Sequence, residues 1–412
     1  MSYTFGWSED FNASSIALAL SGGVLLGSSV VFKTACLSGV LGISNYSKRL
    51  VVQPEMKRVF FLGGMLIASV ILSFTYAGTD DLPVPGSTKA ERRQLFLRLV
   101  LGAFCVGLGA SLQHGCTSGH GLTGLARLSP RSWVAVPTFV VVGLATATVL
   151  QSAKALPPQV LKDVPEWYVG STICACLIFF LILLASFLWV VGRRGSPRAK
   201  EAGLLLGEFF VGGTFGSGLL ISGMARASKV AGFLDVASGH WDLSLPFVMC
   251  GGCFVTFPYF QAVRWLNFQT KSFLHEEHMD LPPPNRMPDR TLVLGAALFG
   301  FGWAVCGVCP GPMWVNLGVN PSREILVGLM SLLAGLCAQD VAKFTRNLIA
   351  ETRADSNESS ARVVCTDIKK VAPSEELPEA VKTGRPSHFS QMSASTHATN
   401  VTNMSDDEEE EC

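Results

Sequence analysis

The sequence predicts an all-α, polytopic membrane protein, and its composition is the first reason. Of its 412 residues, 49% are apolar and only 15% are charged, whereas soluble proteins have about 25% charged residues. The mean hydropathy is +0.38. Such a chain has too little polar surface for a soluble multidomain protein. The composition also excludes a collagen-like chain or a disulfide scaffold as the main body, and no basic block suggests nucleic-acid binding.

The second reason is a series of apolar stretches close to the roughly 20 residues that cross a bilayer as a helix. The first stretch lacks the basic start and small-residue cleavage site of a signal peptide, so we expect it to remain as a span. Nine transmembrane helices are predicted, at 16–34, 59–77, 95–113, 133–150, 169–192, 202–221, 245–263, 291–308 and 323–341.

Four of these spans are followed by short pieces rich in Gly, Ser or Pro. The pieces begin near Ala35, Gly115, Ser222 and Cys309, and all are too short to cross a membrane. Non-helical backbone survives at membrane depth only where protein or a water-filled cavity covers it. We therefore interpret the pieces as re-entrant half-helices that line an internal path. Ordinary interfacial loops are the alternative.

The third reason is an internal repeat. Residues 99–116 and 292–309 share 8 identities in 18 positions at an offset of 193, and Cys116 matches Cys309. A weaker echo links Gly27 with Gly216. Four spans per half and one linking span make the second half enter the membrane from the opposite side. This is an inverted-topology repeat, an architecture that places transporter sites at broken helices.

The chain is accordingly divided into five parts. We expect an extracytoplasmic N-terminal segment, a first membrane repeat, a linking loop with one helix, a second repeat and a disordered, acidic cytoplasmic tail. The tail carries 8 basic and 13 acidic residues, too polar a composition to fold. The boundaries are 1–15, 16–150, 151–201, 202–341 and 342–412.

Orientation follows from basic residues in the short loops. One side of the membrane receives 14 Lys and Arg residues and the other side 8. The richer side faces the cytoplasm. The sequence thus predicts an integral membrane protein, placed in the plasma membrane, with its N-terminus outside and its C-terminus in the cytoplasm.

Three of the 12 cysteines, Cys36, Cys116 and Cys309, lie where a helix breaks beside Gly, Ser or Pro. Small residues that permit close packing are the plain alternative. A neutral thiol in a partly desolvated path is a weak S–H donor on a soft atom, which suits an anion that carries sulfur. The two C-x-x-C pairs lie in apolar spans, which argues against zinc, and we predict no metal site and no cofactor.

Three blocks in order resemble the YeeE/YedE sulfur-transport family. They begin at Gly115-Cys116-Thr117-Ser118-Gly119-His120, at Phe215-Gly216-Ser217-Gly218 and at Gly300-Phe301-Gly302-Trp303, the last ending in Cys309-Pro310-Gly311-Pro312. The resemblance covers residues 16–341 and implies a thiosulfate-uptake permease with nine spans, half-helices and a narrow waist. It implies that cysteines at the waist pass thiosulfate along through S–H contacts. Cys116 and Cys309 match the motifs well, and Cys36 matches them more loosely.

The sequence therefore predicts a transporter that imports thiosulfate or a related inorganic sulfur anion, and not an enzyme. A membrane sulfur-transfer or redox protein with a cysteine persulfide is the alternative, and a passive pore or signalling protein is a third. Lys33 is either functional or snorkels to the interface, and His120 either lines the path or satisfies backbone groups. The expected path residues are Cys36, Ser38, Cys116, Thr117, Ser118, His120, Cys309 and Pro310.

Overall fold

The computed structural model describes residues 13–75, 89–150, 197–238, 241–266, 281 and 287–371. In these ranges the chain forms helices joined by short connections, and no β-strand occurs among them. The predicted span 169–192 lies outside the described residues, as does most of the predicted N-terminal segment.

The described part of the chain contains eight helical segments that are long and apolar enough to cross a membrane. Each coincides with one of the predicted spans, which confirms the all-α, polytopic fold class. The long helices are α1 (Ala13–Leu37), α3 (Met56–Thr75), α4 (Lys89–Gln113), α5 (Pro130–Leu150), α7 (Pro197–Ile221), α9 (Ser244–Trp265), α10 (Arg290–Cys306) and α12 (Arg323–Val371).

Large apolar side chains cover the outer faces of these helices. Phe74, Val149 and Phe254 are exposed by 85%, 81% and 78%. Exposed apolar side chains at this density are costly in water and cost nothing against lipid tails, so they mark a surface that faces the membrane.

Four short helices follow the breaks that the sequence predicts. They are α2 (Ile43–Val52), η1 (Thr117–Leu125), α8 (Ala227–Leu234) and α11 (Pro310–Val319), and a single turn, η3 (Val236–Ser238), follows α8. Each short helix comes directly after a long one, so the expectation of half-helices beside spans is confirmed.

The packing of α4 on α10 has two-fold symmetry. The backbones approach closely where Gly102 meets Gly302 and where Gly109 meets Gly295. An offset of 193 converts Gly102 into Gly295 and Gly109 into Gly302, so each contact is the image of the other. Because the equivalent helices run antiparallel, the two halves have opposite directions, as an inverted repeat requires.

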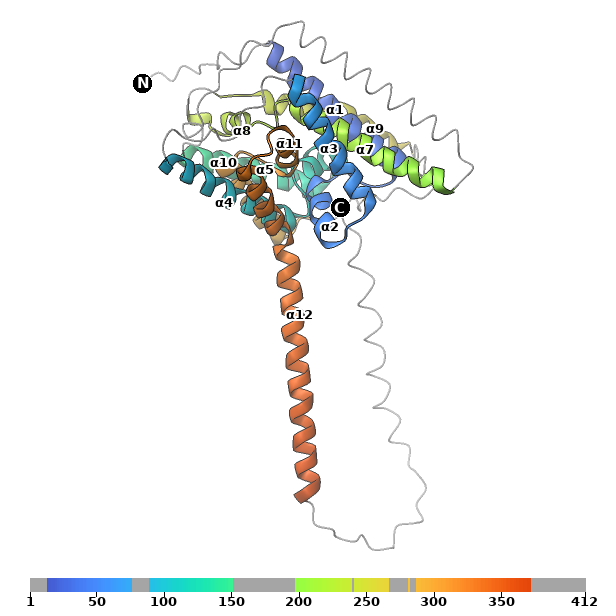
Figure 1. Cartoon of the computed structure of the whole chain (residues 1–412), viewed down its shortest axis with the longest axis vertical. Helices are drawn as coiled ribbons and strands as arrows, with labels where there is room; N and C mark the ends of the chain where they lie inside the picture. The colour runs from blue at the N-terminus through green and yellow to red at the C-terminus, as the bar shows by residue number, and fades with distance from the viewer. Residues whose placement is uncertain are drawn as a thin grey trace. The chain divides into compact units, whose positions relative to one another are not determined.

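Four other long helices, α1, α3, α7 and α9, also pack across the two halves in equivalent pairs (Figure 1). On α1, Gly23 lies against the Val248 carbonyl group of α9, and on α7, Gly212 lies against the Phe61 carbonyl group of α3. Thus α1 packs on α9 as α7 packs on α3, and α1 also packs on α7. Small residues permit these close approaches between membrane helices.

Helix α10 begins with an acidic cap. The Asp289 side chain accepts hydrogen bonds from the Leu292 backbone N–H at 3.1 Å and from the Thr291 hydroxyl at 2.7 Å. It also pairs with Arg131 of α5 at 3.3 Å. Burial raises the pKa of Asp289, but these hydrogen bonds and the Arg131 charge outweigh it, so the pKa lies below its usual value.

The last helix extends beyond the predicted start of the tail at residue 342. Helix α12 continues to Val371, because residues 342–371 contain neither Gly nor Pro, and the next proline is Pro373. The first compact unit ends at Gln339, and the part of α12 that follows belongs to a second unit.

Candidate functional site

Cys116 lies at the start of a wide, glycine-rich helix. Helix α4 ends at Gln113, and the chain turns through His114, which has a φ of +60°. Cys116 is then extended and forms the N-cap of η1, which has π-helical geometry. Within η1, a side chain at Gly124 would overlap the Ser132 hydroxyl group of α5, so only glycine lets η1 pack so closely on α5.

Cys309 occupies the matching position in the second half. Helix α10 ends at Cys306, and its C-cap Gly307 has a φ of +71°, in the left-handed region that favours glycine. Cys309 is extended and forms the N-cap of α11, with Pro310 in the first turn. Proline is well suited to this position because its fixed φ matches the helix and its missing N–H would have no helical partner. Both cysteines therefore cap a short helix after a broken span.

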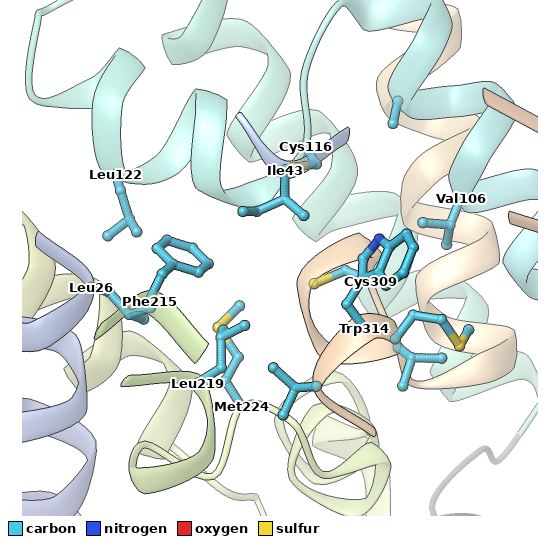
Figure 2. Close-up of a cluster of buried hydrophobic side chains, with 14 of the residues drawn as sticks. Leu26, Ile43, Val106, Cys116, Leu122, Phe215, Leu219, Met224, Cys309 and Trp314 are labelled. Carbon is cyan, nitrogen blue, oxygen red and sulfur yellow. The ribbon is translucent and has the colours of Figure 1, made fainter. Parts of the chain in front are cut away.

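A cavity of about 180 Å³ lies where these two caps meet. Figure 2 shows Cys116, Cys309, Phe215 and Met224 around a common space. The wall combines sulfur atoms, two hydroxyl groups and aromatic rings with aliphatic side chains. Its sulfur-bearing, hydroxyl and aromatic members are Cys116, Cys309, Met224, Met249, Thr117, Ser118, Phe139, Phe215, Phe233 and Trp303.

The polar groups of the wall contact one another. The Cys116 Sγ lies 3.2 Å from the Ser118 Oγ, and the Thr117 Oγ1 lies 3.5 Å from the Cys309 Sγ. The second contact joins the two halves of the repeat. Pro310 and Pro312 have no N–H, so Gly311 alone offers one among the first three residues of α11.

The cavity wall contains no Asp, Glu, Lys or Arg among the described residues that line it. Its positive potential comes from dipoles, because the N-terminal ends of η1 and α11 meet there and helix N-termini carry partial positive charge. The indole ring of Trp303 lines the cavity, and its buried N–H has no acceptor among the described residues. The arrangement can hold a small anion through uncharged donors.

Of the eight residues expected along the path, the structure brings Cys116, Thr117, Ser118 and Cys309 together at the cavity wall. Pro310 is buried beside them but is not part of the wall. His120 is also away from the wall, since its Nδ1 lies 3.0 Å from the Ser132 hydroxyl and its Nε2 lies 3.1 Å from the Gln113 carbonyl. Of the two roles considered for His120, this geometry matches the satisfaction of backbone groups.

Cys36 and Ser38 do not line this cavity. Cys36 lies in the last turn of α1, ten residues beyond the cavity-lining Leu26, which is about 15 Å along a helix axis. Ser38 follows the end of α1 with a φ of +53°. Cys36 therefore lies apart from the cavity that Cys116 and Cys309 line, because α1 runs on past the cavity before it ends.

One buried acidic residue was not predicted from the sequence. Glu208 of α7 is 2% exposed and forms an ion pair with Lys33, which is 5% exposed. The Tyr46 hydroxyl donates to the Glu208 Oε2 at 3.2 Å. One glutamate inside an otherwise apolar span was the available signal, because an ionisable residue at membrane depth indicates function. Lys33 is thus paired and does not snorkel.

Within the described residues, the cysteines form no cluster with metal-binding geometry. The eight cysteines whose side chains the structure describes are free thiols, and Cys250 is exposed while Cys253 is half-buried. No group of three His, Cys, Asp or Glu side chains within the described ranges is placed to hold a metal ion.

Comparison with known proteins gives matches in both halves. Residues 50–146 match the family model described as sulphur transport, and residues 204–350 match a family of unknown function (DUF6691). A probable transporter of Xylella fastidiosa (strain 9a5c) is 39% identical over 128 residues, which are 31% of this chain and 82% of that protein. The chain belongs to the YeeE/YedE sulphur-transport family.

Further relatives of this family are similar over the same length. A second probable transporter of Xylella fastidiosa (strain 9a5c) is 33% identical over 128 residues, and the match covers 89% of that protein. A probable transporter of strain Temecula1 is 38% identical over 126 residues and is covered to 81%. No solved structure matches the chain.

Proposed function

We propose that this member of the sulphur-transport family is a membrane transporter that imports thiosulfate or a related inorganic sulfur anion through the cavity between its two halves. One observation carries the proposal. Cys116 and Cys309, equivalent in the repeat, cap two short helices and line the same cavity. The sulphur-transport family match and the probable-transporter relatives support the same class of function.

The size and chemistry of the cavity suit a small anion with a soft sulfur atom. Pockets for drug-sized ligands measure about 300–1,000 Å³, so a cavity of about 180 Å³ favours a much smaller ligand. Neutral thiols at Cys116 and Cys309 offer weak S–H donors on polarisable atoms. The hydroxyl groups of Thr117 and Ser118 and the helix N-termini serve the oxygen atoms and the negative charge.

The absence of fixed charge from the described cavity wall favours passage over retention. Conduction requires a site that binds well enough to admit an ion and weakly enough to release it. Uncharged thiols and hydroxyls meet that condition, whereas a buried lysine in the wall would hold a dianion tightly. We propose that Cys36, farther along α1, contacts the anion at a later point of the path.

Uptake of labelled thiosulfate tests this function. Cells without their own thiosulfate route would express the wild type, Cys116→Ala, Cys309→Ala and the control Cys105→Ala, a buried cysteine of α4 outside the cavity wall. We expect uptake by the wild type and the control, and reduced uptake by the two cavity variants at equal membrane expression. No uptake by the wild type would exclude the substrate, and full uptake by both cavity variants would exclude the thiols.

The alternative of a persulfide carrier needs a base close to a cavity cysteine. His120 is instead hydrogen-bonded to Ser132 and the Gln113 backbone. A persulfide would add the mass of one sulfur atom to the purified protein after exposure to thiosulfate. Intact-mass measurement therefore separates sulfur transfer from transport, and we expect no added mass.

We further propose that the protein lies in the plasma membrane with its N-terminus outside and its C-terminus in the cytoplasm. The excess of basic residues in one set of loops supports this orientation. Protease treatment of intact cells carrying a terminal epitope tag tests it. An N-terminal tag should be removed and a C-terminal tag should survive.

A further inference from the structure

Lys33, Glu208 and Tyr46 form a charged cluster about two helical turns from the cavity. The ammonium group of Lys33 forms an ion pair with the Glu208 carboxylate and lies 5.6 Å from the centre of the Tyr46 ring. The Tyr46 hydroxyl bonds the same carboxylate at 3.2 Å. The cluster therefore joins α1 and α7, the first helices of the two halves, to the half-helix α2.

Helical spacing directs both charged residues toward the cavity axis. Lys33 comes seven residues after Leu26 on α1, and Glu208 comes seven residues before Phe215 on α7. Leu26 and Phe215 both line the cavity. Seven residues are close to two full turns, so each charged residue shares a face with its cavity-lining residue about 10 Å farther along its helix.

The layer between the cavity and the ion pair is narrow and apolar. Val30 and Val211 lie one turn from the charged residues on the same faces and are 0% and 1% exposed. The half-helix α2 closes this layer, because Ile43 lines the cavity and Tyr46, one turn later, bonds Glu208. An anion that leaves the cavity in this direction meets the ion pair next.

A hydrogen bond connects the same half-helix with the cysteine-capped helix. The Trp314 Nε1 of α11 donates to the Ser47 Oγ of α2 at 2.8 Å. Cys309 is the N-cap of α11. A displacement of α2 that opens the ion pair therefore acts on the helix that carries a cavity thiol.

We propose that Lys33, Glu208 and Tyr46 form a proton-coupled gate, at which the anion replaces Glu208 as the partner of Lys33 while Glu208 takes up one proton. This inference rests on the proposed transport function and names its coupling ion. The proton comes from the water outside the cell, the side from which the anion enters, and binds a carboxylate oxygen of Glu208. No covalent bond other than this O–H bond forms, and nothing is oxidised or reduced.

Linkage gives the coupling its direction. The Glu208 carboxylate and an incoming anion compete for the ammonium group of Lys33. By reciprocity, a protonated Glu208 leaves Lys33 free to attract the anion, so proton and anion bind cooperatively.

Among the described residues, the helices packed around Glu208 contribute the following charged and titratable groups. Helix α1 contributes Lys33, and α2 contributes Tyr46. Helix α3 contributes Arg58, whose charge interacts with the Tyr46 hydroxyl group. The Arg58 guanidinium group also donates hydrogen bonds to the Gln53 carbonyl group and to Glu55. Helix α11 carries no charged side chain.

Uptake into liposomes containing the purified protein tests the gate. With one proton per anion, a difference of one pH unit, acid outside, should raise the accumulation of labelled thiosulfate about tenfold in the wild type. Glu208→Gln keeps the side-chain shape and cannot titrate, so its accumulation should not respond to the pH difference. Asp289→Asn, which removes the exposed carboxylate paired with Arg131 and keeps the helix cap, should respond like the wild type.

A second variant keeps the gate testable if Glu208→Gln does not fold. Lys33→Met combined with Glu208→Met removes both charges, and apolar replacement of a buried ion pair is often tolerated. We expect this variant to insert and to lose the response to pH. Wild-type uptake that ignores the pH difference, or a full response in either variant, would overturn the gate. Absence of any wild-type uptake would overturn the proposed transport and the gate with it.

Discussion

Two neighbouring glycines of α3 should respond in opposite ways to the same substitution. A methyl group on Gly64 would overlap the Phe209 carbonyl oxygen of α7, whereas one on Gly63 would meet nothing within 4 Å. The second half repeats the contrast. Gly251 of α9 meets the Leu20 carbonyl oxygen, and the position before it is Cys250, whose side chain is exposed.

The structure sets the expected magnitudes. In Gly64→Ala, backbone atoms on both sides must separate, and overpacking of this kind costs about 1–3 kcal/mol. In Gly63→Ala, the helix gains about 0.4–1 kcal/mol because alanine loses less backbone entropy. For a large domain, a change of 1 kcal/mol moves the Tm by on the order of 2 °C. Gly64→Ala should therefore lower the Tm by about 2–6 °C, and Gly63→Ala should leave it equal or slightly higher.

Thermal unfolding of the purified protein in one detergent, followed by tryptophan fluorescence, measures this difference. Gly251→Ala should resemble Gly64→Ala, because the repeat places both glycines at equivalent helix crossings. An equal drop in Tm for Gly63→Ala and Gly64→Ala would refute the packing argument. A drop for Gly64→Ala without one for Gly251→Ala would refute the equivalence of the two crossings.

Further predictions concern the cavity, the half-helices and the α10 cap. Cys116→Ser and Cys309→Ser should reduce the uptake of thiosulfate. They should reduce the inhibition of this uptake by competing sulfate to a smaller extent, because serine keeps a donor and loses the soft atom. Trp314→Phe should destabilise the protein by about 0.5–1.5 kcal/mol, visible as a lower Tm, by removing the bond to Ser47. Asp289→Ala should cost about 0.5–2 kcal/mol for the lost cap. Because the pKa of Asp289 is lowered, its contribution is complete above the unfolded value of about 4 and is lost as pH falls through the lower folded value. The Tm difference between wild type and Asp289→Asn should shrink in that range, and a constant difference would contradict it.

Much of the membrane scaffold could be predicted from the sequence, because a bilayer imposes length and hydropathy on every span. The breaks after the spans were also predictable, because clusters of Gly, Ser and Pro at the end of an apolar stretch disfavour continuation of the helix. For example, Gly307 ends α10 in a left-handed conformation, and Pro310 starts α11. The extension of α12 was missed because a polar composition argues against burial, while helix formation also depends on the absence of Gly and Pro.

The site was predictable in part. Cys116 and Cys309 were found because the repeat equates them, and their equivalence fixes a shared location near the symmetry axis. Cys36 has no such partner, and its position depends on where α1 ends relative to the cavity. The partner of Lys33 was unknown because pairing between α1 and α7 joins residues 175 positions apart, which no local pattern reveals.

The distribution of charge explains why the two halves are not interchangeable. The repeat supplies equivalent backbones, equivalent helix crossings and two equivalent cysteine caps, and the described cavity wall between them is uncharged. An anion in such a cavity is held by dipoles that are nearly the same from either direction. The Lys33–Glu208 pair lies two turns from Leu26 and Phe215 on α1 and α7, the helices that the repeat relates. If protons drive uptake, we expect them to act at this pair, because it places a buried carboxylate beside an ammonium group close to the cavity.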